Sequence, residues 1–439
     1  VQGLADDRIE RHPGAASANG DFGHAAARFR PHGQRAAAHQ RIHADRQKAM
    51  HEIAVTHMRP WSRKYDVHEH EMPWEFVKPM WARATGKGVK LDAGPGDGMV
   101  TVCVQTEELC WGDAGLYLRS PSPLLGGSAV AAAGTPEQRE KFLSPFRTGE
   151  PKWGAMAITE AQAGSDAASI QTTAVLDEKT NEWVLNGTKI FCTAGDAALN
   201  HEGGFVVVWA TVDKSAGRGG IKSFVVTAGT PGITVVGCEK KLGIRASDTA
   251  TLVLENCRVP YNHLLGKAEV KKADDAKGDK GFKGAMATFD ASRPIVAAMA
   301  VGVGRAALDF VKEELTRQGV AIRYDSPPTQ QTAIERDVID MEAELQAARL
   351  LTWRAAKMID RGQRNNLEAS MAKAKAGLAV TKITQKAVEL LGPLGYSQQL
   401  LVEKWMRDAK INDIYEGTQQ INQLIVARRI LDYSSSVLR

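Results

Sequence analysis

The sequence predicts a protein of mixed α and β structure, with a helical region, then a β-rich region, then a second helical region that forms a bundle. Three observations predict this order. Helical patterns dominate residues 47–153, short apolar runs separated by glycine-containing turns fill 154–260, and apolar residues recur at steps of three and four from 281 onward. At 439 residues the chain is long enough for two or three structural units around a substantial core.

Composition limits the function classes. Hydrophobic residues make up 43% and charged residues 24%, as in soluble globular proteins, and no run of about 18 consecutive apolar residues predicts a membrane span. The net charge of +5 is spread among acids rather than gathered in a stripe, which argues against nucleic-acid binding. The chain begins without the basic and apolar pattern of a secretory signal.

The cysteines form no CxxC pair and do not cluster with histidines. They stand at Cys103, Cys110, Cys192, Cys238 and Cys257. This spacing argues against a metal site or a disulfide framework and predicts a reducing, cytoplasmic location.

Residues 1–46 differ from the rest of the chain. They are rich in Ala, Arg and His and show neither helical nor strand periodicity. We expect a disordered or non-domain extension, followed by an N-terminal helical domain over 47–153.

Within 47–153, the segment TVCVQTEELCWGDAGLYL at 101–118 predicts a buried helix. Thr135 followed by Pro136 predicts the start of another helix, because Thr caps a helix and Pro suits its first turn.

The middle domain is expected over 154–266. Asn186-Gly187 lies between two apolar runs and predicts a hairpin turn. Further apolar runs follow at short intervals, which is typical of an antiparallel barrel or sandwich. The alternating lysines and acids of 267–283 predict a solvated loop.

The C-terminal region, 281–439, is expected to be a helical bundle. Two apolar seams at steps of three and four predict two of its helices. They are Ile334, Val338, Met341, Leu345, Ala348 and Thr352, then Ala372, Ala376, Ala379, Ile383, Ala387 and Leu390.

Four segments carry candidate chemistry, and each has a structural alternative. The turn MAITEAQAGSDAAS (156–169) has hydroxyls and amides suited to a phosphate or a polar ring edge, although most such turns are plain turns. Phe191 and Thr193 share one face of a strand, where they suit either a flavin or the core. Asp290 and Arg293 form either a local ion pair or a clamp for a nucleotide-bearing ligand.

The fourth segment contains Glu416, just before Gly417 and before Thr418, which can cap the following helix. A carboxylate at such a junction can project into a cavity, whereas most surface glutamates are solvated.

Together these segments resemble the acyl-CoA dehydrogenase family, most closely its medium- and short-chain members, over residues 50–433. The resemblance is carried in order by AITEAQAGSD, NGTKIFCTAG, KKLGIRASDTATLVLENCRVP, AMATFDASRPIVAAMAVGVGRAALD and VEKWMRDAKINDIYEGTQQINQLIVAR. It implies a helical domain, a β-domain and a C-terminal four-helix bundle, with FAD between the β-domain and the bundle.

The resemblance also assigns residues. Glu416 falls on the position of the catalytic base. The cofactor positions are Met156, Ala157, Ile158, Thr159, Ser165, Phe191, Cys192, Thr193, Thr418 and Gln420. The substrate positions are Ser165, Asp290, Arg293, Gly417 and Arg428.

The implied reaction is α,β-dehydrogenation of an acyl-CoA to a trans-2-enoyl-CoA. A carboxylate in a dry pocket removes the α-proton, the backbone amide of Glu416 and a flavin ribityl hydroxyl bind the thioester oxygen, and the β-hydride passes to flavin N5. Electrons then pass to an electron-transfer flavoprotein, as in fatty-acid catabolism.

The sequence departs from the family where a neighbouring subunit holds the adenylate half of FAD. Val320 replaces a Phe after Arg317, Glu389 replaces a Gln, and Pro393 replaces a Gly. A carboxylate beside a pyrophosphate is unfavourable, whereas the residues around the flavin and base are retained. This asymmetry predicts a catalytic subunit in a heterotetramer with a second dehydrogenase-like chain, with a homotetramer as the alternative.

A relative of this fold that binds nucleic acid or has lost its activity is a second function class. The retained Glu416 and the scattered charge weigh against it.

Overall fold

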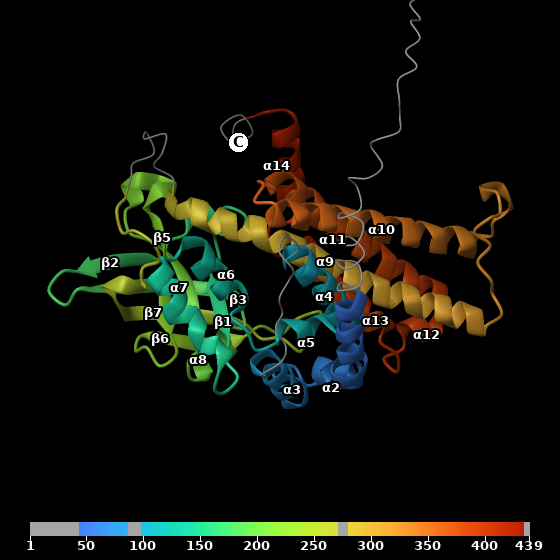
Figure 1. Cartoon of the computed structure of the whole chain (residues 1–439), viewed down its shortest axis with the longest axis horizontal. Helices are drawn as coiled ribbons and strands as arrows, with labels where there is room; N and C mark the ends of the chain where they lie inside the picture. The colour runs from blue at the N-terminus through green and yellow to red at the C-terminus, as the bar shows by residue number, and fades with distance from the viewer. Residues whose placement is uncertain (1–43, 87–97, 271–279, 434–439) are drawn as a thin grey trace, which may run out of the picture. The chain divides into compact units, whose positions relative to one another are not determined.

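The computed structural model describes residues 44–86, 98–270 and 280–433. Most of the 1–46 extension and part of the 267–283 loop therefore lie outside the described residues. The predicted succession of helices, sheet and helical bundle is confirmed (Figure 1).

The N-terminal region is helical. Its elements are η1 (Ala54–Met58), η2 (Arg59–Trp61), α2 (Ser62–Val67), α3 (Trp74–Thr85), α4 (Gly98–Gly112), α5 (Ala114–Leu118), α6 (Leu124–Ala133), α7 (Pro136–Leu143) and η3 (Ser144–Arg147). The predicted buried helix at 101–118 is α4 and α5, which break at Asp113. The predicted start of α7 is confirmed, because Thr135 and Gln138 form a reciprocal capping box.

The middle region contains one seven-stranded sheet in the order β1-β4-β2-β3-β7-β6, with β5 paired to β4. The strands are β1 (Gly154–Ala157), β2 (Thr173–Asp177), β3 (Glu182–Thr193), β4 (Phe205–Thr211), β5 (Ile221–Thr227), β6 (Ile233–Cys238) and β7 (Thr249–Pro260); the short helices are η4 (Ala167–Ser169), α8 (Gly195–Asn200), η5 (Lys214–Gly220) and η6 (Tyr261–His263). The sheet is mixed rather than wholly antiparallel, because β1 and β2 both pair with β4 in parallel.

The hairpin prediction at Asn186-Gly187 is wrong. Both residues lie inside β3, and the chain turns between Asp177 and Glu182 instead. Gly187 has φ of +150° and lies where the register with β7 shifts, so it is part of a β-bulge. A Cβ there would come within 2.5 Å of Thr172, which explains the glycine.

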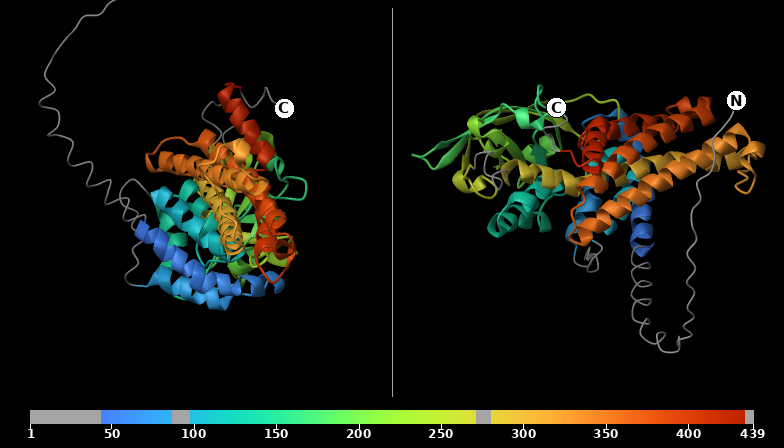
Figure 2. Two further views of the ribbon diagram at one scale, coloured as in Figure 1. Left: turned by 90° about the vertical axis from the view of Figure 1, so that its right-hand side faces the viewer. Right: turned by 90° about the horizontal axis from the view of Figure 1, so that it is seen from above.

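The C-terminal region is the bundle. Its elements are α9 (Lys280–Arg317), η7 (Pro328–Gln330), α10 (Ala333–Asp360), α11 (Asn366–Leu391), α12 (Pro393–Tyr396), α13 (Val402–Ala409), η8 (Lys410–Asp413) and α14 (Gln419–Ile430). Helices α9, α10 and α11 pack side by side, and α13 and α14 pack on α11 (Figures 1 and 2). Both predicted seams are buried or half-buried, which confirms their orientation toward the core.

Helix α9 contains a long apolar segment that is mostly buried. The sequence has no long uninterrupted apolar run, yet Thr288–Arg317 contains an 18-residue window that is apolar enough to cross a membrane. Seventy-eight per cent of that window is buried inside the protein, where α4, α10 and α11 pack against the helix. Burial in the core accounts for its composition.

Candidate active site

Glu416 stands in a strained turn between η8 and α14. Its φ is +57° and that of Gly417 is +89°, so two successive residues adopt the left-handed region. For a non-glycine residue this costs about 1–2 kcal/mol, a strain that proteins keep mainly at functional sites. Thr418 ends the turn by accepting a hydrogen bond from the Ile421 amide at 3.2 Å, which confirms the predicted cap.

Glu416 is half-buried, and its carboxyl lies near the polar groups of Ser292, Arg293 and Lys373. Burial raises its pKa, and this effect outweighs the opposing Ser292 hydroxyl and the Arg293 and Lys373 cations. Ser292 Oγ donates to Glu416 Oε2 at 2.6 Å. The site therefore holds a carboxylate that is more basic than an ordinary glutamate, as proton abstraction requires.

Arg293 comes from α9 and is 4% exposed. Its guanidinium pairs with Asp290 at 3.0 Å and its Nε donates to the Glu416 carbonyl at 3.4 Å. The ion pair suggested by the sequence is therefore present, and it also reaches the Glu416 turn.

Two helices extend this cluster. Asn366 of α11 donates to Asp290 at 2.8 Å and accepts from Arg429 of α14 at 3.0 Å. The neighbouring Arg428 is half-buried, and its Nε has no hydrogen-bond partner among the described residues. Arg428 thus has a buried donor whose hydrogen bond the described residues do not supply.

Three side chains that hold the turn were not predicted from the sequence. Ser292 lies between the two predicted residues Asp290 and Arg293. Lys373 is a lysine on the alanine seam of α11, and its Nζ donates to the Gly417 carbonyl at 2.6 Å. Asn422 of α14 donates to the same oxygen at 2.8 Å. A buried lysine on an apolar stripe was the one signal available.

The second group of candidate residues lies around β1 and the turn that follows it. The side chains of Met156, Ala157 and Ile158 are buried, so contacts from them to a cofactor fall to the backbone. Thr159 is half-buried and Ser165 is exposed.

Glu160 anchors this turn. It accepts hydrogen bonds from the amides of Gln171 and Thr172 and pairs with the buried Lys189 at 2.7 Å. Burial opposes its ionisation, but the hydrogen bonds from Lys189 and Thr172 outweigh burial and lower the pKa of Glu160 to about 2.

Phe191 is 58% exposed and has φ of +57°. It lies where the register between β3 and β7 shifts, and such a bulge turns a side chain out of the regular alternation. Thr193 is half-buried nearby on β3, while Cys192 is buried and points its Sγ at the Met156 carbonyl, 3.6 Å away. An aromatic ring left bare by a strained bulge, with hydroxyls close by, fits an aromatic cofactor such as a flavin.

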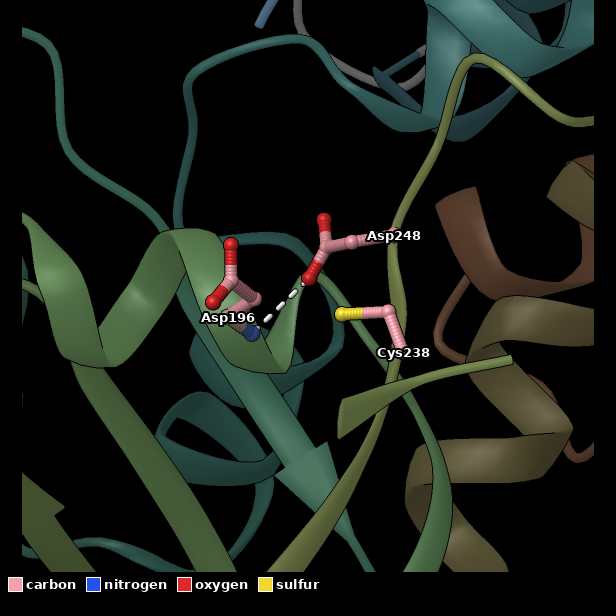
Figure 3. Close-up of side chains that lie close together, drawn as sticks. All are labelled: Asp196, Cys238 and Asp248. Atoms are coloured by element: carbon pink, nitrogen blue, oxygen red, sulfur yellow. Dashed lines mark hydrogen bonds between the residues drawn. The ribbon is translucent and has the colours of Figure 1, made fainter. Parts of the chain in front are cut away.

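A third cluster consists of Asp196, Cys238 and Asp248 (Figure 3). The carboxylate oxygens and the Cys238 Sγ, atoms of the kind that can bind a metal ion, lie within 4.8 Å of one another. Asp248 is already engaged: it pairs with the buried Arg119 and accepts from the Asp196 amide at 2.8 Å. These contacts make it the counter-ion of Arg119 and the cap of α8.

In the adenylate region, the matching residue Arg317 and the departing residue Glu389 both form local ion pairs. Arg317 is exposed and pairs with Glu314. Glu389 is 64% exposed in its side chain and pairs with Lys386 at 2.6 Å. Pro393 begins α12, where its fixed φ suits the first helical turn.

Comparisons with known proteins cover most of the chain. Residues 42–150, 155–257 and 279–431 match the N-terminal, middle and C-terminal domains of acyl-CoA dehydrogenases. Acryloyl-CoA reductase (NADH) of Anaerotignum propionicum is 34% identical over 389 residues, covering 88% of this chain and 93% of that protein.

Two further relatives are similar. The mitochondrial short-chain specific acyl-CoA dehydrogenase of Bos taurus is 40% identical over 298 residues, covering 68% of this chain and 67% of that protein. The solved structure of butyryl-CoA dehydrogenase from Megasphaera elsdenii is 32% identical with a TM-score of 0.76, covering 89% of this chain and 98% of that one.

Proposed function

The chain belongs to the acyl-CoA dehydrogenase family, and from this premise we propose that it converts an acyl-CoA thioester to the trans-2-enoyl-CoA with Glu416 as the base. The observation that carries this proposal is the Glu416 carboxylate, held in a strained turn with a raised pKa. A base of raised pKa is better matched to the weakly acidic α-proton of a thioester.

The chain's own residues divide the remaining work. Arg293 and Ser292 hold the Glu416 carbonyl and carboxylate, and the Glu416 amide binds the thioester oxygen. The remaining proposed substrate contacts come from Asp290, Gly417, Arg428 and Ser165. Arg428 supports this assignment through its unused buried donor.

The cofactor is FAD. We assign its contacts to exposed or half-buried side chains and to the backbone of buried residues. The side chains are Thr159, Ser165, Phe191, Thr193, Thr418 and Gln420, and the backbone contacts come from Met156, Ala157, Ile158 and Cys192. When bound, FAD supplies the acceptor for the β-hydride.

Purified protein tests the proposal directly. We expect a flavin spectrum that bleaches on addition of an acyl-CoA, with butyryl-CoA the first choice because two of the relatives named above are short-chain enzymes. We propose that the reduced flavin passes its electrons to an electron-transfer flavoprotein, and that the reaction belongs to the catabolism of short fatty acids. A stable flavin that no acyl-CoA in a graded series bleaches would contradict this function.

The reverse reaction is a second candidate, because a relative covering 88% of this chain is an NADH-dependent acryloyl-CoA reductase. The same base and flavin serve both directions by microscopic reversibility, and the electron partner sets the direction. Assays of butyryl-CoA with electron-transfer flavoprotein and of acryloyl-CoA with NADH, on one preparation, separate the two.

Replacing Arg293 by Ala is expected to lower kcat/KM by about 10²-fold, because a charged contact is lost and the Glu416 carbonyl is released. Arg293→Lys keeps the positive charge but not the planar set of donors of a guanidinium, so its kcat/KM should lie between those of Arg293→Ala and the wild type. Steady-state kinetics check this. Unchanged constants in Arg293→Ala would leave Arg293 as a structural partner of Asp290 alone.

For assembly, we propose that this chain pairs with a second dehydrogenase-like subunit that supplies the missing adenylate contacts. Expressed alone, the chain should bind FAD weakly: losing two charge-assisted contacts of about 1.5–3 kcal/mol each lowers affinity by two to four orders of magnitude. Co-expression with such a subunit should give a mixed tetramer with two flavins. Flavin content measures FAD binding, and native mass measures the subunit composition. A homotetramer carrying four FAD would refute the proposal.

A further inference from the structure

Lys373 is a charged residue on a face of α11 that is otherwise built of small residues. It lies among Ala369, Ala372 and Ala376, and its side chain is 1% exposed. Burial lowers the pKa of its ammonium to about 8, against the opposing carboxylates of Glu416 and Asp413. A buried lysine is costly, so its partner identifies its role.

That partner is the turn containing Glu416. Lys373 Nζ donates to the Gly417 carbonyl at 2.6 Å, while Arg293 holds the preceding carbonyl, that of Glu416, at 3.4 Å. Because peptide groups are planar, fixing two successive carbonyls also fixes the amides and the direction of the side chain between them. The left-handed φ of Glu416 persists only when such contacts overdetermine it.

The close approach of α11 to this region supports the assignment. A Cβ on Gly377, one helical turn beyond Lys373, would come within 2.6 Å of the Asn412 carbonyl in η8. The absence of a side chain at Gly377 therefore lets α11 lie against the segment that leads into the turn.

We infer that Lys373 is a positioning residue for the base: its buried ammonium holds the Gly417 carbonyl and thereby aims the Glu416 carboxylate. The inference rests on the proposed function of Glu416. Lys373 acts through Gly417.

The charge of Lys373 has a second consequence. The groups facing Glu416 are Ser292 and Arg293 from α9 and Lys373 from α11, while Asp413 of η8 faces Lys373. The Lys373 cation favours the ionised Glu416, so removing it raises the pKa of Glu416 further. Since the base acts when ionised, the acid limb of the kcat/KM profile should move to higher pH.

The test compares Lys373→Met with Lys375→Met in the holoenzyme. Lys375 lies on the same helix but pairs with Glu344 at 2.7 Å and is 29% exposed. For Lys373→Met we expect kcat to fall about 10–100-fold, as a small misplacement of a reacting group does, with KM changed less than about 3-fold. Amide hydrogen exchange of peptides spanning 411–421 should become faster, and Lys375→Met should change neither.

Unchanged exchange at 411–421, or a rise in KM at constant kcat, would overturn the inference. Should Lys373→Met fail to fold, Lys373→Gln replaces it, since it removes the charge and keeps a donor, with the same pH shift expected. If the wild-type protein dehydrogenates no acyl-CoA, the proposed function fails, while the exchange measurement still decides whether Lys373 holds the turn.

Discussion

Glu416→Gln is expected to abolish turnover while the protein still binds FAD and acyl-CoA. The amide is nearly isosteric and keeps the turn and the Ser292 contact, but it cannot accept the α-proton. Loss of a general base costs about 10²–10⁴-fold, and more where solvent cannot replace it. Stopped-flow reduction of the flavin by acyl-CoA measures the step directly.

Glu416→Asp is the matched control, because it keeps a carboxylate and shortens its reach by one methylene. Its rate should fall between those of Gln and wild type. In the wild type, the acid limb of kcat/KM should lie above the pKa of an ordinary glutamate, because burial raises the pKa of Glu416. Near-normal flavin reduction in Glu416→Gln would show that another residue is the base.

Lys404→Met is expected to cause the largest loss of stability. Lys404 of α13 pairs with Asp113 at 2.8 Å and with Asp408 at 2.5 Å, and all three side chains are 1% exposed. The two carboxylates raise the pKa of Lys404 despite its burial. Removing one partner from a buried ion cluster costs about 3–5 kcal/mol, because the remaining charges are left uncompensated.

This cluster joins all three regions. Asp113 caps α5 through the Leu116 amide, and Asp408 accepts from the Ile244 amide in the loop before β7. Its loss should therefore also reduce flavin content. The apparent free energy of unfolding is measured in urea at fixed FAD and protein concentrations.

Lys386→Met serves as the control, since Lys386 makes an exposed pair with Glu389 that is worth about 0–1 kcal/mol. If Lys404→Met lowers the free energy of unfolding no more than Lys386→Met does, then water or a rearranged side chain compensates the charges of the two aspartates.

Several features followed from the sequence because they depend on neighbours along the chain. The order of the three regions followed from apolar periodicity, the start of α7 from Thr135 and Pro136, and the cap of α14 from Thr418. The segment around Glu416 identified the candidate base, because it resembles the segment that contains the catalytic base in the acyl-CoA dehydrogenase family.

Local rules failed where pairing between strands decided the outcome. Asn186-Gly187 suits a hairpin turn, yet pairing with β7 continues through it, and Gly187 became part of a bulge against Thr172. The same sheet exposes Phe191 through a second register shift.

The sequence by itself determined the family, the three regions and Glu416 as the candidate base. Only the tertiary structure decided what surrounds that base: Ser292 from α9, Lys373 from α11 and Asn422 from α14 converge on one turn. The physical reason is range. Periodicity and capping act within a few residues, whereas the strain, burial and raised pKa of Glu416 arise from helices separated by up to 124 positions in the chain.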